Sequence, residues 1–92
     1  MTMASLVALG APALPAGHFY RIGSLAMVDG IHVQIRRKRR RWGSRLLMAA
    51  RPEFWRDGAP VAIERALADA AIEAHQQWTR NDRLAYWTGD HE

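Results

Sequence analysis

The residues best suited to binding a ligand form a basic run near the middle of the chain, where seven of the thirteen Lys and Arg residues fall within ten positions. Arginine outnumbers lysine five to one in residues 36–41. The planar guanidinium group can hold two phosphate oxygens and can stack on a base or an aromatic ring. Trp42 directly follows the run and offers an indole for base stacking, while Gly43 lets another backbone come close. We expect an anionic partner at a site made of Arg36, Arg37, Lys38, Arg39, Arg40, Arg41, Trp42 and Arg45.

The physical basis of this expectation is repulsion among neighbouring guanidinium groups, which phosphates or carboxylates would neutralise. Three interpretations remain open: a nucleic acid or ribonucleoprotein complex, which we favour, an acidic protein surface, and a solvated turn without a partner. A membrane-surface role is disfavoured because the basic residues lie outside the amphipathic helix that the sequence predicts. A membrane-spanning role is excluded because no apolar run approaches the roughly 20 residues that cross a bilayer.

Residues for catalysis or metal binding are scarce. The chain has no cysteine, and Ser44 lies in Trp42-Gly43-Ser44-Arg45 without the pattern of a nucleophile elbow. The spacing of Glu53 and Asp57, beside a proline and a turn, favours a loop charge and a helix cap over a catalytic carboxylate pair. The histidines share no metal-ligand spacing; they are His18, His32, His75 and His91. We therefore predict a non-enzymatic binding protein with no catalytic residue, metal or cofactor.

Length and charge distribution point to one small domain with two electrostatic halves. A chain of 92 residues can bury one modest core. Residues 1–51 carry nine basic residues against one acid, and residues 52–92 carry four against eight, so the halves are near +8 and −4. This asymmetry is typical of a protein with a basic surface that binds a polyanion. The absence of cysteine agrees with a reducing compartment, and the N-terminus lacks the positive region of a signal peptide, so we expect a cytoplasmic protein.

Two strands joined by a tight turn are the clearest local structural prediction. Residues 19–28 and 31–37 favour strands, and Asp29-Gly30 between them is the dipeptide preferred in a type I′ hairpin turn. Such a turn pairs Ser24 with Ile35. The buried face would then comprise Tyr20, Ile22, Ala26, Val28, Ile31, Val33 and Ile35. The other face would comprise Arg21, Leu25, Met27, His32, Gln34 and Arg36, with Leu25 and Met27 either covered by the N-terminal arm or available to a partner.

A third strand is expected over residues 45–50, with Leu46 and Met48 pointing inward, although a short helix there is the alternative. It would place the basic run at the projecting end of a hairpin. Arg51-Pro52 ends this element, and Phe54 and Trp55 are expected to plug one end of the core.

One long helix is predicted from about residue 60 to residue 78. Asp57-Gly58-Ala59-Pro60 has the pattern of a helix start. At helical spacing, one apolar stripe is formed by Ile63, Ala66, Leu67, Ala70, Ala71, Ala74 and Trp78. A smaller stripe contains Val61, Ala68 and Ile72. Either a folded-back C-terminal segment with Leu84, Tyr86 and Trp87 covers this second stripe, which we favour, or it is a protein-contact face bordered by Glu64, Asp69 and Glu73.

The predicted fold is therefore α+β, with a three-stranded antiparallel β-meander packed against one long C-terminal α-helix and with irregular N- and C-terminal tails. Residues 1–17 form an irregular N-terminal arm, because Gly10, Pro12, Pro15 and Gly17 interrupt regular structure. Residues 18–92 form a single domain: the β-meander over 18–51, the helix over about 60–78 and a C-terminal segment over 79–92.

In its shortness, lack of catalytic motifs, charge polarity and sheet-plus-helix layout, the chain resembles small phage-encoded accessory proteins, among which anti-CRISPR inhibitors are one group. That resemblance implies an inhibitor that occludes a surface of a CRISPR effector or another nucleoprotein complex. The acidic residues Glu64, Asp69 and Glu73 would then imitate nucleic acid, or the arginine arm would grip the guide RNA or an acidic subunit. A third class, a subunit of a structural or secretion assembly, would use Leu25, Met27, Val61 and Ile72 as oligomer contacts.

Overall fold

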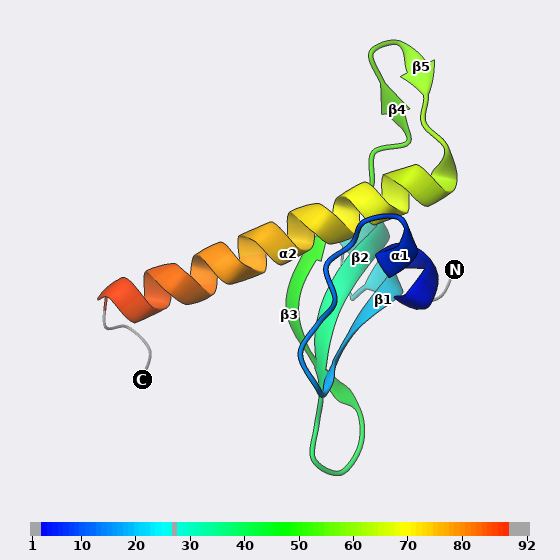
Figure 1. The fold of residues 1–92 in the computed structure, drawn as a ribbon. Coiled ribbons are helices and arrows are strands. Elements are labelled where there is room, and N and C mark those ends of the chain that lie inside the picture. The colour runs from blue at the N-terminus through cyan, green and yellow to red at the C-terminus, as the bar shows by residue number, and fades with distance from the viewer. Residues whose placement is uncertain (1–2, 27, 89–92) are drawn as a thin grey trace.

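A computed structural model of the chain describes residues 3–26 and 28–88, with the side chains of residues 5–26 and 28–81. A three-stranded antiparallel sheet of order β1-β2-β3 packs against a long C-terminal helix, which confirms the predicted α+β fold (Figure 1). The elements in chain order are α1 (Met3–Ala8), β1 (His18–Leu25), β2 (Val28–Lys38), β3 (Ser44–Ala50), β4 (Trp55–Arg56), β5 (Ala59–Pro60) and α2 (Ile63–Thr88).

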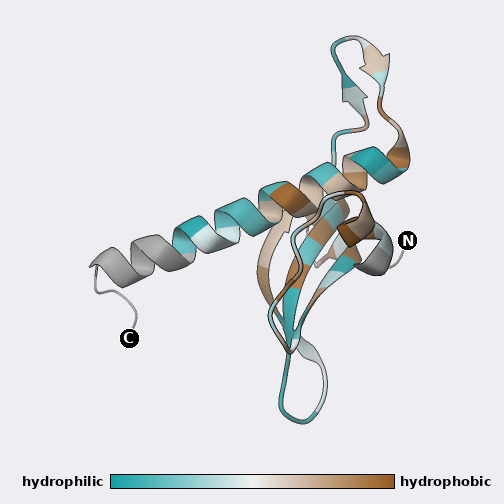
Figure 2. Ribbon diagram, in the orientation of Figure 1, coloured by the Kyte–Doolittle hydropathy of each residue, from teal (hydrophilic) through white to brown (hydrophobic). Residues whose placement is uncertain are grey.

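The core lies between the first half of α2 and one face of the sheet. Val33 and Ile35 in the central strand β2 are fully buried, and Ala71 and Ala74 meet them from the helix with no exposed surface. Because alanine side chains are short, the helix backbone can lie close to the sheet. The hydrophobic segments gather where α1, α2 and the sheet meet, whereas the loop between β2 and β3 is hydrophilic (Figure 2).

The register of the first hairpin differs from the prediction by four residues along β1. Ile35 pairs with Tyr20, not with Ser24, because β1 already ends at Leu25 and β2 begins at Val28, before the Asp29-Gly30 dipeptide. Asp29 and Gly30 instead lie inside β2 at a shift in register, because Ser24 pairs with Ile31 and Leu25 pairs with Val28. Arg51 Nη2 donates a hydrogen bond to the Asp29 carbonyl oxygen there (2.6 Å).

The new register shortens the buried face of the first hairpin. An even shift keeps each residue on its own side of the sheet, so Tyr20, Val33 and Ile35 are buried as predicted and Ile22 is partly buried. The residues nearest the turn, Ala26, Val28 and Ile31, are exposed, which corrects their assignment to the core. Met27 lies outside the described residues.

The third element is a strand, as predicted, but a β-bulge changes which of its side chains point inward. Ile35 pairs with Met48 and Arg36 with Leu46, so Leu47 is the extra residue of β3. Leu47 and Met48 therefore pack against the core, and Leu46 is exposed on the opposite face, which corrects the prediction that Leu46 points inward.

Asp57-Gly58 forms a hairpin turn and not the predicted helix start. Both residues have positive φ, 53° at Asp57 and 78° at Gly58, as a type I′ turn requires, and they join β4 to β5. This small hairpin projects from the start of α2 (Figure 1). Phe54 and Trp55 are consequently exposed, by 42% and 65%, and do not plug the core. The helix itself begins at Ile63, and Ile63 is also exposed.

The N-terminal arm is more ordered than expected. Residues 10–17 are irregular, but Met3–Ala8 form α1, and Leu6 and Ala11 belong to the core with 1% and 3% exposure. Tyr20 Oη donates a 2.6 Å hydrogen bond to the Pro12 carbonyl oxygen, and burial raises the pKa of this phenol. The arm is therefore part of the packed domain.

The N-terminal arm, and not the C-terminal segment, covers the second apolar stripe of α2. Ala68 is fully buried in the same cluster as Leu6, and Ile72 lies against Gly10, where an added Cβ would be 3.8 Å from Ile72 Cδ1. Arg65 Nη2 also donates to the Leu9 carbonyl oxygen (2.8 Å). Because α2 continues to Thr88, the predicted fold-back of Leu84, Tyr86 and Trp87 is wrong.

Candidate functional site

The basic run occupies the end of the second hairpin, as the sequence indicated. Lys38 and Ser44 form the last residue pair between β2 and β3, and residues 39–43 make the loop. The Arg39 amide donates to the Gly43 carbonyl oxygen (3.1 Å), and Gly43 adopts a φ of 78° that favours glycine. The loop projects from the body of the molecule at the end opposite the β4–β5 hairpin (Figure 1).

The cations of this loop are exposed and close together. Arg37, Lys38, Arg39, Arg40, Arg41 and Arg45 all have exposed side chains. Among the described side chains, the ion pairs join Asp69 to Arg56 (3.7 Å) and to Arg65 (2.9 Å), and both lie away from the loop. The positive charge of the loop is therefore compensated by no described carboxylate, and its self-repulsion would fall on contact with an anion.

A hollow of about 400 Å³ lies beside the loop, with Trp42 at its edge. Its lining residues are Phe19, Lys38, Arg39, Arg41, Trp42, Gly43 and Ser44. The Trp42 side chain is 86% exposed, whereas Phe19 is partly buried. Phe19 was not predicted as part of the site, although the strand order implies its position. In an antiparallel hairpin the start of β1 must lie beside the end of β2, and Phe19 pairs with Arg36.

Arg36 differs from the rest of the predicted site because its guanidinium group is held within the sheet. Nε donates to Ser44 Oγ (2.7 Å), Nη2 to the Ser44 carbonyl oxygen (3.1 Å), and Nη1 to Gln34 Oε1 (2.7 Å). Gln34 is 1% exposed and in turn donates to the Gly23 carbonyl oxygen (3.1 Å). Arg36 therefore fixes the base of the loop and is not available to a partner in the way that its exposed neighbours are.

Replacing Arg36 with methionine is expected to lower the free energy of unfolding by about 1–3 kcal/mol, because the buried Gln34 Oε1 would lose its donor. Urea denaturation would measure the change. Arg37→Met is the matched control, since Arg37 is the next residue along β2 and is exposed. Equal stability of the two variants would contradict the structural role of Arg36.

The remaining candidates for chemistry are not gathered into one site. His32 is nearly buried, and its Nδ1 has no hydrogen-bond partner among the described residues. His18 and His75 both lie against Trp78, and their ring centroids are 5.4 Å and 5.9 Å, respectively, from that of Trp78. His91 lies outside the described residues. Within the described part of the chain, no three His, Asp or Glu side chains are placed to hold a metal ion.

The described acidic side chains of α2, which are Glu64, Asp69 and Glu73, do not form a free anionic stripe. Asp69 accepts a hydrogen bond from Arg65 Nε (3.0 Å) in addition to its ion pairs, and Glu73 accepts one from Gln77 (3.2 Å), while Glu64 is exposed. Arg51 and Arg56 line a small hollow together with Glu53, Asp69 and Glu73. Charges of both signs are therefore interleaved along this surface.

The described apolar residues considered as partner contacts lie on separate segments of the chain. Leu25 in β1, Val61 between β5 and α2, and Ile72 in α2 are each partly buried, and Met27 lies outside the described residues. Exposed apolar surface that was not predicted from the sequence lies at the β4–β5 hairpin and at the start of α2, where Phe54, Trp55 and Ile63 are exposed. Its signal was the Asp57-Gly58 dipeptide, because a hairpin turn there lifts the preceding aromatic residues away from the core.

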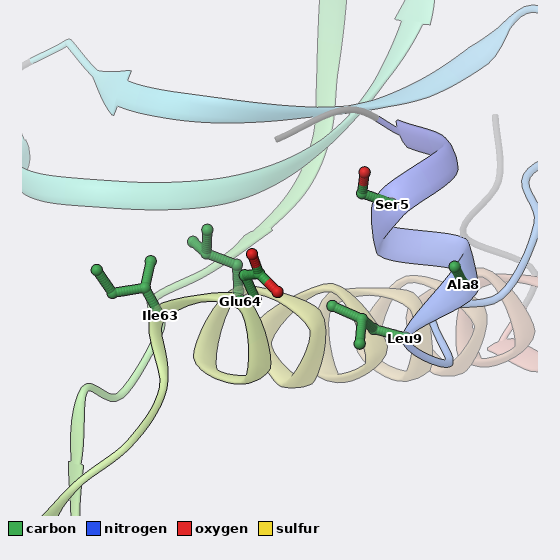
Figure 3. Close-up of a pocket in the computed structure, with 6 residues that line it drawn as sticks. Ser5, Ala8, Leu9, Ile63 and Glu64 are labelled. Carbon is green, nitrogen blue, oxygen red and sulfur yellow. The ribbon is translucent and has the colours of Figure 1, made fainter.

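A second, larger hollow of about 620 Å³ lies between α1 and the start of α2 (Figure 3). Ser5, Ala8 and Leu9 line it from one side, and Ile63, Glu64 and Leu67 from the other. Its lining is mostly apolar with one carboxylate, so it lacks the cations that surround the hollow beside Trp42.

No described helix is long and apolar enough to cross a membrane. No protein-family model, curated protein or solved structure matches this chain.

Proposed function

We propose that this protein is a non-enzymatic binding module whose β2–β3 loop contacts the phosphates of a nucleic acid or of a nucleoprotein complex. The observation that carries the proposal is the cluster of exposed cations on residues 37–41 and Arg45, with no described carboxylate paired to them. Phosphates would relieve the repulsion among these side chains and release their own counterions. Such a partner agrees with a cytoplasmic location for this cysteine-free chain.

The anchoring of the loop supports this proposal. Arg36 holds both the side chain and the backbone of Ser44, and the Lys38 amide donates to the Gly17 carbonyl oxygen (2.8 Å). The base of the loop is therefore fixed before a ligand arrives, which reduces the entropy lost on binding.

Fluorescence anisotropy of labelled single-stranded and duplex oligonucleotides, measured across a salt series, tests the proposal. We expect binding at low salt that weakens steeply, with a log–log slope of about −0.9 for each phosphate neutralised on duplex DNA. No binding of either oligonucleotide at low salt would reject free nucleic acid as the partner.

A second candidate function is favoured by the exposed Phe54, Trp55 and Ile63 at the opposite end of the molecule. Exposed aromatic side chains are typical of protein interfaces. The protein would then occlude a protein surface within a nucleoprotein complex, as an inhibitor of the anti-CRISPR type does. Binding to a CRISPR effector ribonucleoprotein, without binding to its free RNA, would support this candidate over the first.

A further inference from the structure

We propose that the hollow between Phe19 and Trp42 binds an unpaired nucleotide, so that the protein prefers single-stranded nucleic acid to duplex. This inference rests on the proposed function and adds a second kind of contact to it. The loop cations would bind phosphates of any nucleic acid, whereas the hollow would take a base whose faces are free.

The aromatic side chains supply the first argument. Trp42 keeps 86% of its surface in water although indole is among the largest apolar groups, and it stands on a loop closed by the Arg39–Gly43 hydrogen bond. Phe19 faces the same hollow from β1 and is held by its pairing with Arg36. Bases within a duplex are already stacked on both faces, so only an unpaired base can stack on such a ring.

The charges around the hollow supply the second argument. Lys38, Arg39 and Arg41 line it, and none of the described acidic side chains does. A nucleotide carries its phosphate a short distance from its base. One nucleotide can therefore stack its base on the aromatic ring while its phosphate contacts the cations. The volume of about 400 Å³ lies within the range of small-ligand sites.

Two other hollows in the described part of the chain differ from this one in charge and in aromatic content. The one between α1 and α2 is apolar and contains Glu64, and the one beside Asp69 has three carboxylates against two arginines. Neither has an aromatic residue in its lining. The hollow beside Trp42 thus combines an aromatic edge with uncompensated positive charge, which is the combination found in single-strand binding grooves.

The inference is tested by comparing the affinities of the protein for a strand with bases and for a strand without bases. We would measure anisotropy with an oligothymidylate and with an abasic oligonucleotide of the same length and charge. At equal salt, the oligothymidylate is expected to bind about tenfold more tightly, since base–aromatic stacking of this size is usual. An oligouridylate of the same length would show whether the hollow takes ribonucleotides as well as deoxyribonucleotides.

The variant Trp42→Ala is expected to lower affinity for the oligothymidylate about tenfold and to leave affinity for the abasic strand unchanged, because the loop charges are intact. Its matched control is Trp55→Ala, which removes another exposed indole, from the hairpin at the opposite end of the molecule. In addition, quenching of tryptophan fluorescence by the oligothymidylate should disappear in Trp42→Ala and persist in Trp55→Ala.

Two results would overturn the inference while leaving the phosphate-binding proposal in place. One is equal affinity of the wild type for the oligothymidylate and the abasic strand. The other is equal effects of Trp42→Ala and Trp55→Ala on oligothymidylate binding. Failure of the wild type to bind any of these strands at low salt would overturn the inference and would also reject free single-stranded nucleic acid as the partner.

Discussion

Changing Arg39 and Arg41 to glutamine is expected to weaken binding of a single-stranded oligonucleotide about thirtyfold at low salt, because two phosphate contacts worth about 1 kcal/mol each would be lost. Both side chains are exposed and line the hollow beside Trp42. The dependence of log affinity on log salt should also become shallower by about 1.4, at about 0.7 for each phosphate contact on a single strand. Anisotropy titrations of wild type and variant across a salt series measure both quantities.

The matched control is the pair of substitutions Arg51→Gln and Arg56→Gln, which removes the same charge from the other end of the molecule. Arg51 donates to the Asp29 carbonyl oxygen, and Arg56 lies 3.7 Å from Asp69, so both side chains already have partners within the protein. Their loss should change affinity by less than about threefold, through net charge alone. If both double variants weakened binding equally, the protein would be attracting nucleic acid by overall charge and not by its loop.

The location of the basic residues was predictable because it depends on neighbours in the sequence. Six consecutive basic residues cannot be buried, so they had to lie in an exposed segment, and the strands on either side placed them at a hairpin end. The hydrogen bonding of Arg36 within the sheet, which its exposed neighbours do not share, was not predictable in the same way. It depends on Gln34 and Ser44, which meet Arg36 only through the pairing of β2 with β3.

The two Asp-Gly dipeptides show where local signals are insufficient. Asp57 adopts positive φ beside Gly58 and completes a type I′ turn, whereas at Asp29-Gly30 only the glycine does so. The sequence analysis assigned the turn to the wrong dipeptide, because the same two residues suit a turn, an irregular strand or a helix cap. The choice is made by distant contacts, such as the hydrogen bond from Arg51 to the Asp29 carbonyl oxygen.

Core residues were easier to predict than the pairing between strands. The period of two along a strand assigned Tyr20, Val33 and Ile35 to one face, and an error of four residues in the register leaves that assignment unchanged. The extent of the core was not predictable, because it depends on where α2 crosses the sheet. Val28 and Ile31 have the right alternation but lie beyond the packed region, with about half of their surface exposed (47% and 49%).

The substitution Leu6→Ala is expected to lower the free energy of unfolding by about 3 kcal/mol, which is a large fraction of the stability of a domain this small. Leu6 is 1% exposed and is among the largest fully buried side chains. It packs in one cluster with Ala68 and Tyr20, so its truncation would leave a cavity where the arm, the helix and the sheet meet. Urea denaturation should show a lower midpoint with an unchanged m-value.

Val7→Ala is the matched control, because Val7 is the next residue of α1 and is 39% exposed, so its truncation should cost less than about 1 kcal/mol. The comparison separates packing from helix propensity. A helix of six residues is too short to be stable by itself, and so α1 exists only because Leu6 is buried against the rest of the domain. Equal effects of the two substitutions would mean that Leu6 contributes no packing to the core. The predicted difference would instead establish that the domain begins before His18.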